Sequence, residues 1–257
     1  MERVLFLSPR KLESIEPSGW QRLYVGNEFC ERLMPDDDYI KRVRDEKGAD
    51  MPVSLVTPYL TDAGLNKVMD IIERFAVSEP LFDEVVINDW GLLRKTRGLK
   101  LTRILGRLLI RQLRDPRIIR WKRTTPDRFL RVDDLSVNDE FVSFLLTEGI
   151  GRVELDTVPE DISVLAGRLK LSLYRSFTYI TTTRLCPVAN LAARDRFVLY
   201  VPKTCGFECI GRGYALDDEV MGERIYLFGN AMFFRNDATA GDEPPPVFDR
   251  IVYQQLP

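Results

Sequence analysis

Short apolar segments alternate with longer amphipathic segments along the first 180 residues. Several of the apolar segments contain almost no polar residues, which is typical of parallel strands that are covered on both faces. The longer segments between them carry apolar residues at helical spacing. Repeating strand–helix units predict an α/β fold with a parallel sheet. The expected strands are residues 3–8, 22–27, 53–58, 84–89, 117–121, 152–158 and 169–174.

Three of the longer segments have the pattern of amphipathic helices. Residues 61–76 begin with Thr61, a residue type that often caps helices, and residues 136–149 begin with Ser136. Residues 101–115 place several leucine and isoleucine side chains on one helical face. About seven strands with intervening helices predict a (β/α) TIM-type barrel, closed or slightly incomplete. A doubly wound open sheet is the alternative.

The pattern changes after residue 180. Residues 197–202, 224–230 and 231–236 predict short antiparallel strands, and residues 237–246 have the composition of a flexible loop. We therefore expect residues 1–180 to form the barrel core. Residues 181–257 are expected to form a cysteine-bearing segment and a β-hairpin extension, packed on the barrel as one structural unit.

The 257-residue chain contains no histidine, which excludes Ser–His and Cys–His catalytic pairs and histidine-rich zinc sites. The formal net charge of −2 gives no overall indication of nucleic-acid or membrane binding. No apolar run reaches the roughly 18 residues of a transmembrane segment, and the first residues lack the features of a secretory signal. We therefore expect a cytoplasmic protein, in which cysteines are reduced or bind metal.

The four cysteines have an uneven spacing. Cys205 and Cys209 are four residues apart, Cys186 precedes them, and Cys30 follows the second expected strand. The C-terminal ends of barrel strands meet at one face, so Cys30 can approach the other three. Four thiolates suit either Zn²⁺ or an iron–sulfur cluster, and the uneven spacing is more acceptable for a cluster. Unrelated buried cysteines and a disulfide are the alternatives.

Four motifs occur in the order "YVGNEFC", "VVINDWGLL", "TTTRLCP" and "CGFEC". In this order they resemble the U thirty-two peptidase family, also called collagenase-like, and most of all its UbiV-like branch. The resemblance implies a barrel-like fold and a [4Fe–4S] cluster held by Cys30, Cys186, Cys205 and Cys209, with zinc as the alternative metal. It also implies a redox or O₂-independent hydroxylation component that acts with a related partner subunit, as a heterodimer.

Polar residues at the ends of expected strands are further candidates, since the working face of such a barrel lies there. Asn88 and Asp89 in "NDWG", and Glu154 and Asp156, are candidate catalytic residues. The alternatives are a helix-capping turn for the first pair and mutual pairing inside the barrel for the second. Arg184, two residues before Cys186, is a candidate for binding an anionic substrate or tuning a cluster; a surface or capping role is equally open.

Residues 94–123 contain twelve lysines and arginines and one acidic residue. Four of the arginines recur at helical spacing and would form one stripe: Arg103, Arg107, Arg111 and Arg114. The stripe predicts either a solvated helix face or a docking surface for an anionic partner, such as RNA, an acidic protein or anionic lipid.

Two other functions stay open. One is a structural zinc or iron–sulfur protein without catalysis. The other is a hydrolase, such as a peptidase, that uses carboxylates at the barrel mouth. Enzymatic activity is therefore undecided, with an oxidoreductase or hydroxylase component favoured over a peptidase because no proteolytic dyad is recognisable.

Overall fold

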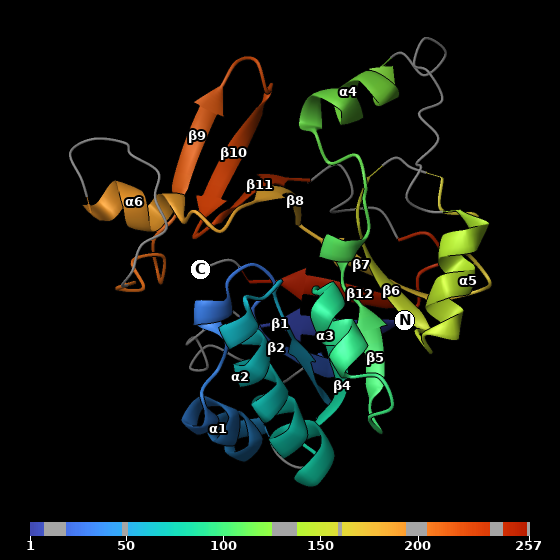
Figure 1. The fold of residues 1–257 in the computed structure, drawn as a ribbon. Coiled ribbons are helices and arrows are strands. Elements are labelled where there is room, and N and C mark those ends of the chain that lie inside the picture. The colour runs from blue at the N-terminus through green and yellow to red at the C-terminus, as the bar shows by residue number, and fades with distance from the viewer. Residues whose placement is uncertain are drawn as a thin grey trace.

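The computed structural model describes residues 1–7, 19–47, 51–124, 138–158, 161–193, 205–236 and 244–255. These residues form a closed barrel of eight parallel strands and a four-stranded antiparallel sheet (Figure 1). The predicted (β/α) TIM-type barrel with a β-rich extension is therefore confirmed. No helix of the described part is both long enough and apolar enough to cross a bilayer.

The barrel strands neighbour one another in chain order, with the last strand closing the ring between the seventh and the first. They are β1 (Glu2–Phe6), β2 (Arg22–Gly26), β3 (Val53–Val56), β4 (Phe82–Ile87), β5 (Thr102–Leu105), β6 (Arg152–Asp156), β7 (Lys170–Arg175) and β12 (Arg250–Gln254). The smaller sheet has the order β8 (Phe177–Thr182), β11 (Ala231–Arg235), β10 (Glu223–Phe228) and β9 (Tyr214–Asp218).

The helices lie between the strands. They are η1 (Glu31–Leu33), α1 (Asp37–Lys47), α2 (Asp62–Ile72), the π-helix η2 (Glu73–Ser78), α3 (Trp90–Lys95), η3 (Arg107–Leu109), α4 (Pro116–Thr124), α5 (Asp139–Thr147) and α6 (Pro187–Ala193). The predicted cap of α2 is confirmed, because the Thr61 hydroxyl accepts a hydrogen bond from the Gly64 amide at 3.1 Å. Ser136, the expected start of the next helix, lies outside the described residues.

Alternate residues of each barrel strand face opposite sides, which produces two apolar layers. One layer packs between the strands and the surrounding helices and includes Leu23, Leu55 and Leu171. The other fills the barrel interior and includes Val86 and Val252. The strands are thus apolar on both faces, which explains their nearly continuous apolar runs.

Two predicted elements are wrong. Residues 101–115 do not form a helix: β5 pairs with β4, and η3 and an irregular segment follow it. Residues 117–121 do not form a strand but lie in α4, which starts at Pro116. Proline suits the first helical position, and the Asp115 carboxylate accepts the Arg117 amide at 2.9 Å. Pro116 and the Asp115 cap favour the start of a helix more strongly than the β-branched Ile118 and Ile119 favour a strand.

The expected arginine stripe is therefore not formed on a helix. Arg103 lies in β5 and donates to the carbonyl oxygens of Leu93 and Glu148. Arg107 and Arg114 are buried in ion pairs with carboxylates. Arg107 and Arg114 share the Asp156 carboxylate in the interior and cannot form an exposed stripe, and the anionic partner stays a prediction.

The smaller sheet adjoins the barrel through β8 and β11, whereas the β9–β10 hairpin extends away from it, as Figure 1 shows. Tyr179 of β8 and Phe233 of β11 pack against Phe29, which follows β2, with ring centres 5.6 and 5.3 Å away. The chain then returns to the barrel through β12, so the barrel takes its last strand from beyond residue 180. The expected strand at residues 197–202 lies outside the described residues, whereas β10 and β11 confirm the two later predicted strands.

Candidate functional site

All four cysteines line one cavity of about 250 Å³. Cys30 follows β2, Cys186 immediately precedes α6, and Cys205 and Cys209 lie between α6 and β9. None of them forms a disulfide. The fold thus brings four free thiols from distant parts of the sequence to one cavity beside the C-terminal ends of the barrel strands.

The end of β2 places Cys30 at the cavity. Gly26 has φ of +124°, and a Cβ atom there would lie 2.1 Å from the Val56 carbonyl oxygen, so the position requires glycine. The Asn27 side chain then accepts hydrogen bonds from the amides of Phe29 (2.9 Å) and Cys30 (2.7 Å). This Asx turn ends the strand and directs the chain into η1.

The start of α6 positions Cys186. The Thr183 hydroxyl accepts the Leu185 amide at 3.1 Å, which shapes the approach to the helix. The Cys186 carbonyl oxygen accepts both the amide (3.1 Å) and the side-chain Nδ2 (2.8 Å) of Asn190. Cys186 is therefore fixed from both sides by local hydrogen bonds.

The "CGFEC" motif forms a turn and not a regular helix. Phe207 has φ of +59°, a left-handed conformation that is uncommon for a residue with a side chain. Its amide donates to the Cys205 sulfur at 3.4 Å. The turn brings Cys205 and Cys209 to the same cavity.

The thiols lie in surroundings that disfavour isolated thiolates. Burial raises the pKa of Cys209 to about 12, and the neighbouring Cys186, Cys30 and Cys205 add to this. Burial also raises the pKa of Cys30 and of Cys186, against the opposing effect of nearby backbone amides. Several thiolates can therefore coexist in this cavity only when a positively charged group compensates for them.

Among the described residues, no three or more Cys, Asp or Glu side chains are arranged to hold a single metal ion. Tetrahedral zinc has Zn–S bonds of about 2.3 Å, so its sulfur ligands lie about 3.8 Å apart. A [4Fe–4S] cluster binds each of four cysteines to a different iron atom. In this structure the four thiols line one cavity without converging on a single point.

Arg184 and Tyr59 form another part of the cavity wall. The Arg184 guanidinium donates to the Leu60 carbonyl oxygen at 3.0 Å and lies 5.5 Å from the centre of the Tyr59 ring. The Tyr59 hydroxyl lies 3.4 Å from the Thr182 hydroxyl. Arg184 thus places a cation beside the four thiols, where it lowers the cost of negative charge.

Asn230, in the turn between β10 and β11, also lines the cavity and was not among the residues singled out from the sequence. Its side-chain nitrogen donates to the carbonyl oxygens of Phe29 (2.6 Å) and Thr183 (2.8 Å). The sequence signal was the Gly229–Asn230 pair, which indicates a tight turn between two strands but no contact with distant segments.

The mouth of the barrel is closed by Arg107, which is 0% exposed. Its guanidinium donates to Glu28 (2.9 and 2.7 Å), to Asp156 (2.6 Å) and to Gln254 (2.7 Å). Its central carbon lies 3.7 Å from the centre of the Tyr174 ring. The face that usually carries the active site of such barrels is therefore filled by protein side chains.

The predicted catalytic pair Asn88 and Asp89 forms loop-stabilising bonds. Asn88 donates to the Thr57 carbonyl oxygen (2.9 Å) and accepts the Leu108 amide (3.0 Å). Asp89 caps α3 by accepting the Leu92 amide (2.9 Å), and its other carboxylate oxygen accepts the Leu60 amide (3.0 Å). These are the bonds of a helix-capping turn, and a catalytic role for the pair stays a prediction.

Glu154 and Asp156 lie inside the barrel. Glu154 accepts the Tyr174 hydroxyl at 2.9 Å through Oε2, while its Oε1 has no partner among the described residues. Burial, followed by the nearby Glu28 carboxylate, raises the pKa of Glu154 to about 7. Asp156 accepts bonds from Arg107 and from Arg114, both at 2.6 Å. Neither carboxylate lines the cysteine cavity.

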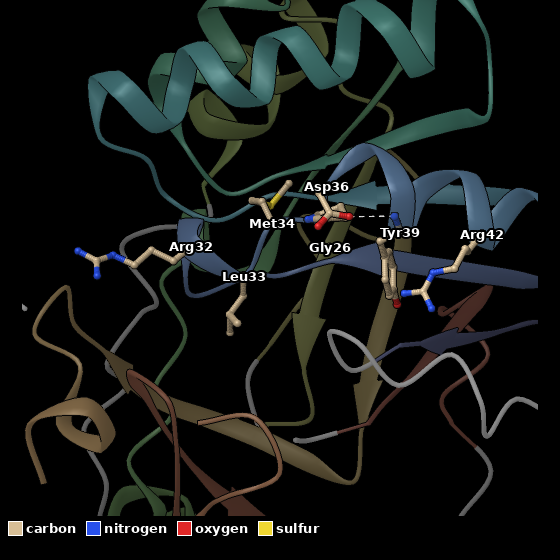
Figure 2. Close-up of a pocket in the computed structure, with 8 residues that line it drawn as sticks. Gly26, Arg32, Leu33, Met34, Asp36, Tyr39 and Arg42 are labelled. Atoms are coloured by element: carbon tan, nitrogen blue, oxygen red, sulfur yellow. Dashed lines mark hydrogen bonds between the residues drawn. The ribbon is translucent and has the colours of Figure 1, made fainter. Parts of the chain in front are cut away.

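A second cavity of about 330 Å³ shares Arg32 and Leu33 with the cysteine cavity. Figure 2 shows Arg32 pointing away from Tyr39 and Arg42. The Arg42 guanidinium lies 5.8 Å from the centre of the Tyr39 ring. The two arginines therefore do not converge on one anion, and this cavity lacks the focused charge of a binding site.

No family model matches the sequence, and no curated protein matches it significantly. Among solved structures, the chain is similar to the U32 peptidase Mk0906, with a TM-score of 0.47, 12% identity, and coverage of 100% of this chain and 94% of that chain. It is also similar to a glycoside hydrolase family 18 N-acetylglucosaminidase from Paenibacillus barengoltzii, with a TM-score of 0.36 and 12% identity. The match covers 98% of this chain and 94% of that chain. At this level of similarity neither comparison identifies a substrate or an activity.

Proposed function

We propose that the protein is an iron–sulfur protein in which Cys30, Cys186, Cys205 and Cys209 hold one [4Fe–4S] cluster. The observation that carries the proposal is the single cavity lined by all four cysteines of a chain that contains no histidine. The four sequence motifs that resemble the UbiV-like branch of the U thirty-two family support the same assignment. A reducing, cytoplasmic location is part of the proposal, because the thiols must stay available as ligands.

The surroundings of the cysteines support the proposal that positively charged iron atoms bind to the thiolates. The raised pKa values of Cys30, Cys186 and Cys209 mean that, without a compensating cation, the cavity favours protonated thiols. Deprotonation in a buried site becomes favourable when metal ions replace the protons. The Phe207 amide already donates to a cysteine sulfur, a kind of contact that tunes iron–sulfur centres.

A cluster with four cysteine ligands has no open coordination position, so it supplies one-electron transfer. The Phe207 amide and the Arg184 cation would favour the more negative, reduced state of such a cluster, whereas burial would oppose it. We propose that the protein is the electron-transferring component of a redox system, such as one that carries out O₂-independent hydroxylation. A related partner subunit, in a heterodimer, would complete the reaction, since the described barrel mouth is filled by Arg107 and its partners.

A hydrolase that uses barrel-mouth carboxylates is not what we propose. Glu154 and Asp156 are 0% and 2% exposed, and Tyr179 of β8 and Phe233 of β11 pack against Phe29 beside this end of the barrel. A substrate would have to displace the ion pairs of Arg107 before it could contact either carboxylate, and breaking such buried pairs is costly.

The proposal is tested by purifying the chain without oxygen and measuring iron and acid-labile sulfide. We expect about four of each per chain, with broad absorption from iron–sulfur charge transfer. Each single Cys→Ser variant should lower the cluster content. Tyr59→Phe is the matched control, because Tyr59 lines the same cavity without a sulfur. Zinc without sulfide would support a structural zinc site, and the absence of both metals after reconstitution would refute the proposal.

A further inference from the structure

We infer that Asn230 is the positioning residue that assembles the cysteine-bearing segments into one binding site. The inference rests on the proposed function, since it concerns how the same cavity becomes able to hold a cluster. Asn230 is 7% exposed and lies in the turn between β10 and β11, far in sequence from Cys30 and Cys186.

The side chain of Asn230 joins the segments that lead to two of the cysteines. Its Nδ2 donates to the carbonyl oxygen of Phe29, the residue before Cys30, at 2.6 Å. The same nitrogen donates to the carbonyl oxygen of Thr183, three residues before Cys186, at 2.8 Å. The Asn230 carbonyl oxygen in turn accepts the Thr183 amide at 3.0 Å. One residue therefore fixes the distance between the approaches to Cys30 and Cys186.

The preceding residue of the turn extends the contact to the other cysteines. Gly229 has φ of +59°, and a Cβ atom at this position would lie 3.8 Å from the Cys209 sulfur. The Gly229 carbonyl oxygen also faces the Val188 amide in α6, at 3.4 Å. The Gly229–Asn230 turn thus touches the segments of Cys30, Cys186 and Cys209, which no local sequence pattern brings together.

An asparagine meets a specific chemical requirement at this position. Two carbonyl oxygens face the same side-chain atom, so that atom must offer two hydrogens, as the amide nitrogen does. An aspartate of the same shape would place an oxygen against both carbonyl oxygens and leave them without donors. Buried polar groups without partners are strongly unfavourable, so the two segments would separate.

The test compares Asn230→Asp with Asn236→Asp. Asn236 lies just beyond the other end of β11, is also buried, and also donates through Nδ2 to a backbone carbonyl oxygen, that of Thr157 at 2.5 Å. The partners of this Nδ2, Thr157 and Thr178, lie in segments that carry no cysteine. A role limited to general stability predicts that both variants lose stability and that neither changes the electron paramagnetic resonance signature of the reduced cluster.

We expect Asn230→Asp to lose its cluster to an iron chelator about tenfold faster than the wild type, the equivalent of one lost hydrogen bond. The electron paramagnetic resonance signature of any remaining reduced cluster should also change. Asn236→Asp should keep the wild-type rate of cluster loss and the wild-type signature. Asn230→Ala, which removes the amide without adding charge, provides the second variant if Asn230→Asp does not fold. Wild-type rates and signatures in both Asn230 variants would overturn the inference.

A cadmium titration separates this inference from the proposed function. Cadmium binds thiolates and gives a charge-transfer absorption without requiring sulfide or a redox reaction. If the wild type binds no iron–sulfur cluster, the proposed function fails. The inference then still predicts about tenfold weaker cadmium binding in Asn230→Ala than in the wild type and in Asn236→Asp. Equal cadmium affinity in all three proteins would refute it.

Discussion

The central carbon of the Arg107 guanidinium lies 3.7 Å from the centre of the Tyr174 ring, and the hydroxyl of that ring donates to Glu154 at 2.9 Å. Arg107 also binds Glu28, which lies two residues before Cys30. A continuous set of buried polar contacts therefore runs from the interior of the barrel to the segment that carries the first cysteine. Its energetics can be tested separately from any metal.

Replacing Arg107 by methionine should destabilise the fold by about 3–5 kcal/mol, because Glu28 and Asp156 would be left as buried carboxylates without a counterion. Urea unfolding of the two proteins measures the difference. Arg224→Met is the control, since Arg224 forms an exposed ion pair with Asp217 and should cause little change. Equal stability of wild type and Arg107→Met would contradict the assigned ion pairs.

Glu154→Gln should remove a pH-dependent part of the stability. The pKa of Glu154 is raised from 4.5 to about 7, so the fold favours the protonated form. This contribution is fully present below pH 4.5 and is lost as pH rises through about 7. The difference corresponds to about 3 kcal/mol. The unfolding free energy, measured between pH 5 and 8, should therefore fall less in Glu154→Gln than in the wild type. The control is Glu140→Gln, at an exposed site in α5, which should show the same pH dependence as the wild type.

Gly26→Ala should destabilise the fold more than Gly98→Ala. Both glycines have positive φ, which costs an alanine about 1–2 kcal/mol. At Gly98 no atom lies within 4 Å of the added Cβ, whereas at Gly26 the Cβ would lie 2.1 Å from the Val56 carbonyl oxygen. Thermal unfolding of both variants provides the comparison. Similar losses at the two positions would show that the close approach of β2 and β3 is not tight.

Asp89 can be tested as a helix cap. Asp89→Ser keeps a side-chain acceptor for the Leu92 amide but loses the oxygen that accepts the Leu60 amide, so it should be destabilised less than Asp89→Ala. Asp89→Ala removes the acceptor and should lose about 1 kcal/mol in urea unfolding. Once a turnover assay exists, Asp89→Ser also tests the catalytic prediction, because it removes the carboxylate while retaining the cap. A large loss of activity in an Asp89→Ser protein that stays folded under the assay conditions would favour catalysis.

Most barrel strands could be predicted from the sequence because they are nearly continuous apolar runs, as in residues 53–58 and 84–89. β5 could not: its four residues are followed by leucines at helical spacing, and only its pairing with β4 determines the strand. β12 was also missed, because its role in closing the barrel depends on its pairing with β1 and β7. Local patterns report local structure, whereas these strands are defined by neighbours far along the chain.

The same distinction applies to the site. The placement of Cys30 beside the later cysteines follows from barrel topology, which brings strand ends to one face. The burial of Arg107 has no local signal, since its partners Glu28 and Gln254 lie 79 and 147 residues away. A helical spacing of arginines suggested a solvated stripe, but burial within ion pairs takes two of them into the interior.

The strand β12 follows every cysteine in the sequence, yet it completes the ring between β1 and β7. During synthesis the ring therefore stays open until all four thiols have been made. The stretch from β8 to β11 is held at both of its ends by adjacent strands, so its ends cannot drift apart once the ring has formed. Closing the ring reduces the number of arrangements open to Cys186, Cys205 and Cys209, which lowers the entropic cost of gathering them.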